Sequence, residues 1–518
     1  MSCNMKTTPQ FLFPMGEDQG KGCGRSPHCM PKQFHCVIPL FLTLTAVVLL
    51  LAGCMTVGPD YEPPVTTLPQ AWNTDVPAST AAPELAEWWR IFADPLLDNL
   101  MVCAQTNNLD LRQAEARLRQ ARAQRLLAGA DRLPTLGAGG SARRSQNRLG
   151  SGADGTTTYD SSFDASWEVD LFGGQRRAVE AVEASLQASR ESLRDVTVSL
   201  LAEVALNYVQ YRAAQSRLAV VAGNLLAQTE TYQLTVWRHE ASLVTQLDVD
   251  QARMSLEQTR AELPALRTTL HQTEHQIALL LGRTPGSLVA ELESSAPQIP
   301  LPAATLSIGF PADILRQRPD VRQAERKLAA QTAQIGVAAA ARYPNLTLGG
   351  SIGYSALSLG DLYGSAARTI QGFVSAGLTL FDGGRIRQQV AIQTAMQEES
   401  LAAYQATVLT ALKEVEDALV SLVNEAERQT AMDAAAAAAA SAFALAQEQY
   451  AAGLTDFQSV LTSQQSLLAT QNSLTLSHAE VASAAIRLYK ALGGGWSAAP
   501  ESNKSDEFEN EAITGEKL

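Results

Sequence analysis

Aromatic and charged side chains are both scarce in this chain of 518 residues, at 6% and 18% of the total. Lysine and arginine number 40 against 53 aspartates and glutamates, which gives a formal net charge of −13. A nucleic-acid partner is therefore not expected, because binding to phosphates needs clustered basic side chains. The sequence also contains no phosphate-binding loop, so a process that needs energy would have to draw it from a partner protein.

Cysteine is almost missing from the main part of the chain. Four of the six cysteines precede Cys54, and only Cys103 follows it. A disulfide framework or a thiolate metal site cannot be built from that single remainder. We expect no metal, no cofactor and no enzyme activity.

Long hydrophobic runs are missing too, with one exception near the N-terminus. The apolar run Val37–Leu51 follows Met30-Pro31-Lys32 and is too short for a transmembrane helix of about 20 residues. This arrangement indicates a signal peptide. We expect residues 1–53 to be that signal peptide together with an over-called extension ahead of Met30.

The run ends in Leu51-Ala52-Gly53-Cys54, which resembles a bacterial lipobox. Cys54 is then the lipidated first residue of the mature protein, and the alternative is an ordinary signal peptide with an incidental cysteine. Met55 follows in place of the aspartate associated with inner-membrane retention, which favours the outer membrane. Residues 54–82 predict a lipidated, proline-rich tether.

Proline and glycine are rare in two long stretches that therefore predict helix. Residues 175–281 contain one of each, and residues 385–492 contain Gly453 alone. A straight helix of that length does not fit a compact domain, so each stretch should form a helical hairpin. We expect one reversal between His239 and Gln246 and the other at Gly453, because glycine tolerates a positive φ. In the second stretch, apolar residues step by threes and fours as in a coiled-coil seam, at Leu401, Tyr404, Val408, Leu412, Val415, Leu419 and Leu422.

A strict alternation marks residues 158–171. The even positions are all polar and include Asp160, Asp164 and Glu168, whereas the odd positions are apolar except for one serine. A period of two puts these sets on opposite faces of a strand. The run exceeds the roughly 9–11 residues of a tilted transmembrane strand, so one face could meet lipid while the acidic face lines water. A strand of a soluble sandwich alternates in the same way, and that alternative stays open here.

The chain repeats itself at an offset of about 210 residues. Asp-Leu-Arg-Gln-Ala-Glu at 110–115 returns as Asp-Val-Arg-Gln-Ala-Glu at 320–325, and Pro134 returns as Pro344. Each half predicts helices that begin after capping Asp or Asn residues such as Asp94, then two strands, then a hairpin. The expected parts are a first repeat 83–282 with strands at about 135–148 and 158–171, a linker 283–311, a second repeat 312–496 with strands at about 345–356 and 371–381, and a disordered acidic tail 497–518.

Four strands cannot close a barrel, and a sheet with an unpaired edge is not stable in lipid. Several copies of the chain should therefore associate. Two copies would give eight strands, whose interior side chains fill, and three would give twelve with room for a lumen. Both strand pairs begin and end beside the long helical hairpins, so the helices should continue the barrel away from the membrane as a tunnel.

Five motifs carry a family resemblance. They are the lipobox, Gly-Pro-Asp-Tyr-Glu-Pro-Pro at 58–64, Leu-Arg-Gln-Arg-Pro-Asp-Val-Arg at 315–322, Phe-Asp-Gly-Gly at 381–384 and Arg-Leu-Tyr-Lys-Ala-Leu-Gly-Gly-Gly-Trp at 487–496. In this order the chain resembles TolC/OprM-type outer-membrane efflux lipoproteins of the NodT branch, from Cys54 to Trp496.

This resemblance implies an α+β membrane protein: a homotrimer whose twelve-stranded transmembrane β-barrel continues as a long periplasmic α-helical barrel. It further implies a lipid-anchored protein of the bacterial outer membrane that extends into the periplasm. Its partners would be a periplasmic adaptor and an inner-membrane pump, and it would conduct small molecules passively to the exterior.

The resemblance also implies roles for the two hairpin tips. The expected adaptor-docking residues are Ser242, Leu243, Val244, Thr245, Gly453, Leu454 and Thr455. Ser242 stands where the family favours glycine, and the alternative for Leu454 is packing across its own hairpin. The expected gate residues are Asp248, Asp250, Phe457, Gln458, Thr462 and Gln465, although the acidic residue expected near Thr462 is missing. Asp160, Asp164 and Glu168 are expected to face the lumen, either to hydrate its mouth or to favour cations.

Two short motifs match enzyme patterns and are assigned to structure. His271-Gln272-Thr273-Glu274-His275 matches a metalloprotease signature, but nothing nominates a further ligand, so a solvated helix face is favoured. Residues 349–353, Gly-Gly-Ser-Ile-Gly, match a nucleophile motif that requires a sharp turn from strand to helix. Strand alternation continues through Ser351, so small residues of a barrel wall are favoured there.

Two functions from different classes remain. The first is a passive export conduit within a tripartite pump, and the second is a structural envelope lipoprotein that does not conduct. The exported substrate cannot be read from the sequence.

Overall fold

The computed structural model describes residues 56–65, 69, 71–74, 85–146, 155–294, 297–302 and 316–496. All of them belong to the second of two units, Met55–Leu518. The expected signal peptide, Cys54 and the acidic tail therefore lie outside the described residues. None of the described helices combines the length and the apolar content that a helical membrane span needs.

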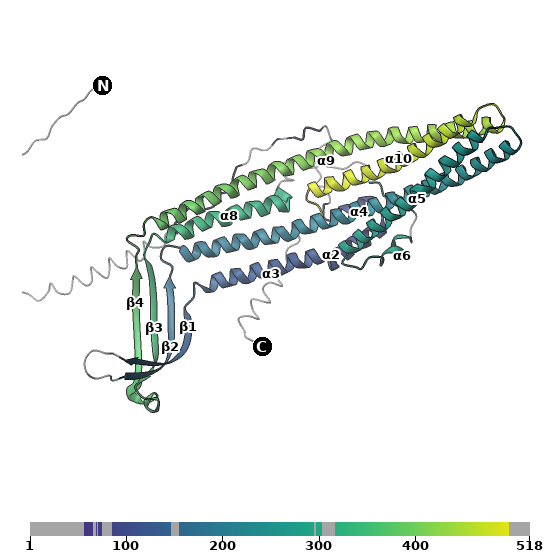
Figure 1. Cartoon of the computed structure of the whole chain (residues 1–518). Helices are drawn as coiled ribbons and strands as arrows, with labels where there is room; N and C mark the ends of the chain where they lie inside the picture. The colour runs from purple at the N-terminus through teal and green to yellow at the C-terminus, as the bar shows by residue number, and fades with distance from the viewer. Residues whose placement is uncertain are drawn as a thin grey trace, which may run out of the picture. The chain divides into compact units, whose positions relative to one another are not determined.

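The described chain is mostly helical, with four antiparallel strands (Figure 1). The first half consists of η1 (Trp88–Phe92), α2 (Pro95–Asn107), α3 (Leu109–Ala130), β1 (Thr135–Gln146), β2 (Gly155–Val169), α4 (Gly174–Glu240), α5 (Gln246–Leu280) and α6 (Val289–Leu292). The second half consists of α8 (Pro319–Ala340), β3 (Asn345–Ala356), η2 (Leu359–Asp361), η3 (Ser365–Ala367), β4 (Arg368–Gly377), α9 (Arg385–Ala451) and α10 (Phe457–Ala491).

The two halves repeat each other in element lengths as well as in sequence. The long helices α4 and α9 have 67 residues each, their partners α5 and α10 have 35 each, and α3 and α8 have 22 each. At a rise of 1.5 Å per residue, each of the longest helices extends over about 100 Å. Both reversals lie where the sequence predicts them, at 241–245 and 452–456.

Local side-chain chemistry fixes where the helices begin. Asp94 caps α2, because its Oδ1 accepts from the backbone N–H groups of Leu96 and Leu97 at 2.9 and 3.3 Å. Asn108 caps α3 by accepting from the N–H of Leu111 at 2.9 Å. The helices that follow the strands start differently: the residues before α4 and α9 are Gly173 and Gly384, with φ of 80° and 89°.

The helices form two hairpins, α4–α5 and α9–α10, and a row in which α3, α4, α8 and α9 are successive neighbours (Figure 1). The largest core cluster joins η1, α2, α4, α5 and α10 around Trp88, Leu201, Tyr208, Ile277 and Ile486. Trp88 stacks on Tyr489 with ring centroids 5.5 Å apart. This core ties the first hairpin to the last helix of the chain.

The predicted seam of α9 is buried at its centre, where it packs against two helices, α8 and α10. Val408 packs against Val321 of α8, and Val415 and Leu419 pack against Leu488 of α10. Leu401, Tyr404, Leu412 and Leu422 are partly buried along the same line. The seam therefore holds α9 to its own hairpin partner and to the neighbouring repeat.

The sheet has the order β1-β2-β3-β4, and its central pair joins the two repeats (Figure 1). Phe163 of β2 pairs with Ile352 of β3, and Trp167 pairs with Leu348. Within the described residues, β1 and β4 each pair on one side only. The sheet of a single chain is therefore open at both edges.

Two strands, β2 and β4, differ from their expected bounds at both ends. β4 spans Arg368–Gly377 and not 371–381, because its last partner is Asn345, the first residue of β3 after Pro344. Leu378 and Leu380 keep the alternation but have no strand to pair with. β2 likewise spans Gly155–Val169 and ends where Val169 pairs with Leu346, instead of continuing to 171.

Candidate functional site

The register divides the sheet into a polar and an apolar face, since residues directly opposite each other point to the same side. One face carries the row Ala138, Phe163, Ile352 and Ile370. The opposite face, named here the polar face, carries 24 strand residues: Thr135, Gly137, Gly139, Ser141, Arg143, Ser145, Thr156, Thr158, Asp160, Ser162, Asp164, Ser166, Glu168, Asn345, Thr347, Gly349, Ser351, Gly353, Ser355, Thr369, Gln371, Phe373, Ser375 and Gly377.

The three acidic residues expected to face the lumen lie together on the polar face. Asp160 accepts from the hydroxyl of Ser141 at 3.1 Å and from that of Ser355 at 2.7 Å, so its carboxylate joins three strands. Asp164 accepts from Ser162 at 2.8 Å, and Glu168 is exposed. Serine donors hold two of these carboxylates close to the sheet.

The tips of the two helical hairpins have the same backbone turn. At the first tip Ser242 has φ of 58° and Leu243 donates its N–H to Arg238 O at 2.8 Å. At the second, Gly453 has φ of 75° and Leu454 donates its N–H to Gln449 O at 2.8 Å. Ser242 thus adopts the left-handed conformation that favours glycine, so the departure from the family pattern leaves the turn intact.

The apolar residue that follows each turn is open to solvent. Leu243 is 72% exposed and Leu454 is 79% exposed. The alternative that Leu454 packs across its own hairpin is therefore wrong for the chain by itself. Each tip instead presents one leucine at the point where its hairpin reverses.

Relief of the strain at Ser242 should stabilise the first tip. We expect Ser242→Gly to stabilise the turn locally by about 0.5–1 kcal/mol, because glycine carries no steric penalty at positive φ. Slower amide hydrogen exchange between residues 243 and 250 would report the gain. Gly453→Ser is the matched control and should speed exchange at the second tip. Equal exchange in the parent and in Ser242→Gly would contradict the assigned strain.

Acidic side chains near the tips accept hydrogen bonds at the starts of α5 and α10. Thr245 and Asp248 form a capping box for α5, in which the Asp248 carboxylate accepts from the Thr245 N–H at 2.8 Å. Asp456 caps α10 through Ser459, and the bonds from the Ser459 hydroxyl and N–H hold the pKa of Asp456 below its ordinary value. Asp250 accepts from Gln246 Nε2 at 3.1 Å.

The other expected gate residues divide into two groups. Gln458, Thr462 and Gln465 are exposed on α10, with Gln458 Nε2 and Thr462 Oγ1 3.4 Å apart. Phe457 is only 3% exposed and packs beside Tyr450, with ring centroids 5.8 Å apart. Its inclusion among the gate residues needs correction, since the hairpin's own core already covers it.

A contact between the two tips was missed by sequence reasoning. The guanidinium carbon of Arg238 lies 4.2 Å from the centroid of the Tyr450 ring, and Arg238 Nη2 donates to Ala451 O at 3.1 Å. The residues are more than 200 positions apart, and no motif links them. This contact joins the end of α4 to the end of α9.

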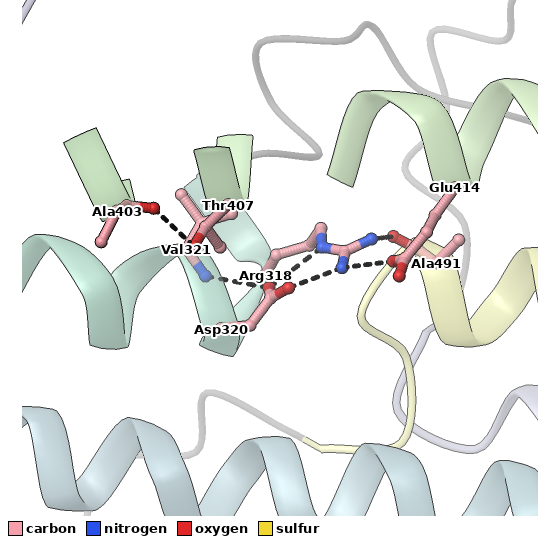
Figure 2. Close-up of polar contacts among 7 residues, drawn as sticks. All are labelled: Arg318, Asp320, Val321, Ala403, Thr407, Glu414 and Ala491. Carbon is pink, nitrogen blue, oxygen red and sulfur yellow. Dashed lines mark hydrogen bonds and ion pairs between the residues drawn. The ribbon is translucent and has the colours of Figure 1, made fainter. Parts of the chain in front are cut away.

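Farther from the tips, Arg318 ties together three helices. It lies just before α8 and donates from Nη2 to Asp320 at 2.6 Å and to Glu414 of α9 at 2.7 Å, as Figure 2 shows. Its Nη1 donates to the carbonyl of Ala491 at the end of α10, also at 2.7 Å. The pKa of the nearby Asp195 is raised, first because its carboxyl group is buried and second because the Asp320 carboxylate is negatively charged.

Neither enzyme-like motif forms a catalytic site. Glu274 is 1% exposed and accepts from the N–H groups of Gly286 and Leu288 at 3.1 and 3.3 Å, so it holds the turn after α5. His271 and His275 are exposed, and the part of the chain described here contains no group of three potential metal ligands. Ser351 lies within β3, which continues through residues 349–353 without a turn.

The sequence matches the family model for outer membrane efflux proteins over residues 100–283 and 310–494. Nodulation protein T of Rhizobium leguminosarum bv. viciae is 32% identical over 460 residues, which are 88% of this chain and 94% of the relative. The pyoverdine export outer membrane protein OpmQ of Pseudomonas putida is 32% identical over 478 residues, 89% of this chain and 97% of the relative.

A solved structure of the outer-membrane channel OprN has the same fold, with a TM-score of 0.80 at 35% identity. The match covers 85% of this chain and 99% of that one. The family, the repeated helical hairpins and the two-faced sheet agree with one another. This chain therefore belongs to the outer membrane efflux protein family and is an outer-membrane channel component of an efflux system.

Proposed function

We propose that three copies of this chain form one continuous channel, with twelve strands in the outer membrane and the helical hairpins in the periplasm. The observation that carries this proposal is the open, two-faced sheet. Unpaired strand edges are not tolerated in lipid, so β1 of one copy would pair with β4 of the next. Twelve strands leave room for a lumen, whereas the interior of an eight-stranded barrel is filled by side chains.

The polar face would line the water-filled lumen and the apolar face would meet lipid. Exposed Phe163, Ile352 and Ile370 support this, since one row of large apolar side chains crosses three strands with nothing covering it in the single chain. On the other side, Asp160, Asp164 and Glu168 would contribute nine carboxylates to a trimeric lumen.

Planar bilayers containing the purified full-length protein test this proposal. Discrete single-channel currents, together with a mass of three copies by native mass spectrometry, are expected. A monomer or a dimer, or protein that inserts and passes no ions once its tips are opened, would contradict the channel described here.

We expect Phe163→Arg to destabilise the inserted protein by about 2–4 kcal/mol, because a charge near the middle of the strand would face hydrocarbon. Asp164→Asn is the matched control on the adjacent residue and the opposite face, and it should leave insertion and assembly intact. Denaturant titration in lipid vesicles measures both. If the two variants insert and unfold alike, the faces have been assigned the wrong way round.

The anchor and the partners complete the proposal. Cys54 would be acylated and would be the mature N-terminus, so intact-mass measurement should find a lipid-modified chain that starts there. An unmodified chain cut elsewhere would exclude the lipid anchor. The hairpin tips, with exposed Leu243 and Leu454, would dock a periplasmic adaptor that connects the channel to an inner-membrane pump, and Asp248, Asp250, Gln458, Thr462 and Gln465 would line the closed end.

A further inference from the structure

One residue of the polar face differs in chemical character from the others. Among its 24 described strand residues, all are polar or glycine except Phe373 of β4. The ring of Phe373 is not hidden, because the residue is 57% exposed. A large aromatic side chain on an otherwise polar, glycine-rich surface calls for an explanation.

The neighbouring strand makes room for this ring. Phe373 pairs directly with Gly349 of β3. A Cβ atom added to Gly349 would lie 2.6 Å and 2.8 Å from the two Cε atoms of the ring and closer still to Cζ. The far end of the ring therefore lies over the bare glycine backbone. Any side chain at position 349 would push the ring away from the sheet.

This arrangement turns one side of the ring toward the sheet and the other toward solvent. An aromatic ring across from a glycine protects the strand pair, which accounts for the side that meets Gly349. It does not account for the exposed side. An aromatic face that is open, as this one is in the single chain, attracts other aromatic groups in offset or edge-on geometry, and it attracts cations.

The surroundings favour one chemical class. The rows that flank Phe373 on the polar face contain Asp164 on one side and Glu168 on the other, both on β2. With the strands about 4.8 Å apart, β2 lies roughly 10 Å from β4 across the sheet. An aromatic molecule with a positive charge could therefore contact the ring while its charge remains near carboxylates.

We propose that the ring of Phe373 is a contact site for aromatic groups of molecules that pass along the polar face, and thus a specificity-determining residue of the channel. The inference rests on the proposed function, in which the polar face lines the lumen. Three copies would place three such rings at one level of the barrel.

Two probes of equal charge and similar size test it in planar bilayers of the full-length protein. Benzyltrimethylammonium has an aromatic ring, and cyclohexylmethyltrimethylammonium has an aliphatic ring that is more hydrophobic. A merely apolar contact would favour the second probe, whereas the proposed contact favours the first. We expect the aromatic probe to reduce the channel current at about fivefold lower concentration than the aliphatic probe.

Phe373→Leu keeps an apolar side chain over Gly349 and should remove this fivefold preference. Phe373→Trp should restore it. Phe163→Leu, on the opposite face, is the matched control and should leave the preference as it is. Equal block of the parent channel by both probes, or an unchanged preference in Phe373→Leu, would overturn this inference alone. Absence of current in every preparation, those with opened tips included, would overturn the channel proposal and this inference with it.

Discussion

Replacing Leu243 and Leu454 together by aspartate should abolish adaptor docking and export while leaving the protein folded in the membrane. Both side chains are more than 70% exposed and lie at the reversal of their hairpins, so neither contributes to the core of its own chain. We expect both leucines to act as hot spots, the few buried residues at the centre of an interface that contribute about 2 kcal/mol or more each. Two charges in their place should weaken adaptor binding at least about 100-fold.

Crosslinking to the co-expressed adaptor measures docking, and native mass spectrometry checks assembly of the variant. The control replaces both leucines by methionine, which keeps the tips apolar and should dock normally. A double aspartate variant that still crosslinks and exports would place the docking surface elsewhere on the hairpins. Loss of assembly would show that the leucines are buried between copies of the chain.

Loss of the Arg318 side chain should strongly lower the folding stability of the helical part of the chain. Its side chain is 7% exposed, and its guanidinium donates to Asp320, Glu414 and the carbonyl of Ala491. Removing one partner of a buried ionic network leaves the others without compensation. Since Glu414 is about half exposed and can hydrate, we expect Arg318→Ala to lower the free energy of unfolding by about 2–4 kcal/mol.

Arg322 offers a control on the same helix. Its side chain is 41% exposed and its ion pair with Glu191 is long, at 3.8 Å. Arg322→Ala should cost less than about 1 kcal/mol, as exposed ion pairs usually do. Chemical denaturation followed by circular dichroism compares the two variants. Similar losses would mean that the network at Arg318 contributes little beyond an ordinary surface pair.

Function and fold class could be predicted from patterns that repeat. The hairpins follow from the scarcity of proline and glycine, and the two faces of β2 follow from its alternation. The conduit hypothesis is confirmed by membership of the efflux family, and the non-conducting scaffold finds no support there. Asp94 caps α2 as its position suggested, because capping depends on residues only two or three positions apart.

Contacts between distant segments could not be predicted in this way. The extent of β4 depends on where β3 begins, so the alternation of Leu378 and Leu380 misleads without the register. Alternation along β4 already puts Phe373 on the face of Gln371 and Ser375, but the position of its ring over Gly349 emerges only from the register. The family resemblance implies a gate role for Phe457, but Tyr450 and Val460 enclose its side chain.

Equal helix lengths in the two repeats restrict how this protein can change in evolution. Each hairpin consists of a helix of 67 residues and a helix of 35 residues, so both tips lie at the same distance from the sheet. Seven residues inserted into both helices of one hairpin alone would lower that tip by about 10 Å and leave an uneven rim. Lengthening or shortening of this protein should therefore occur as paired events, one in each half of the gene.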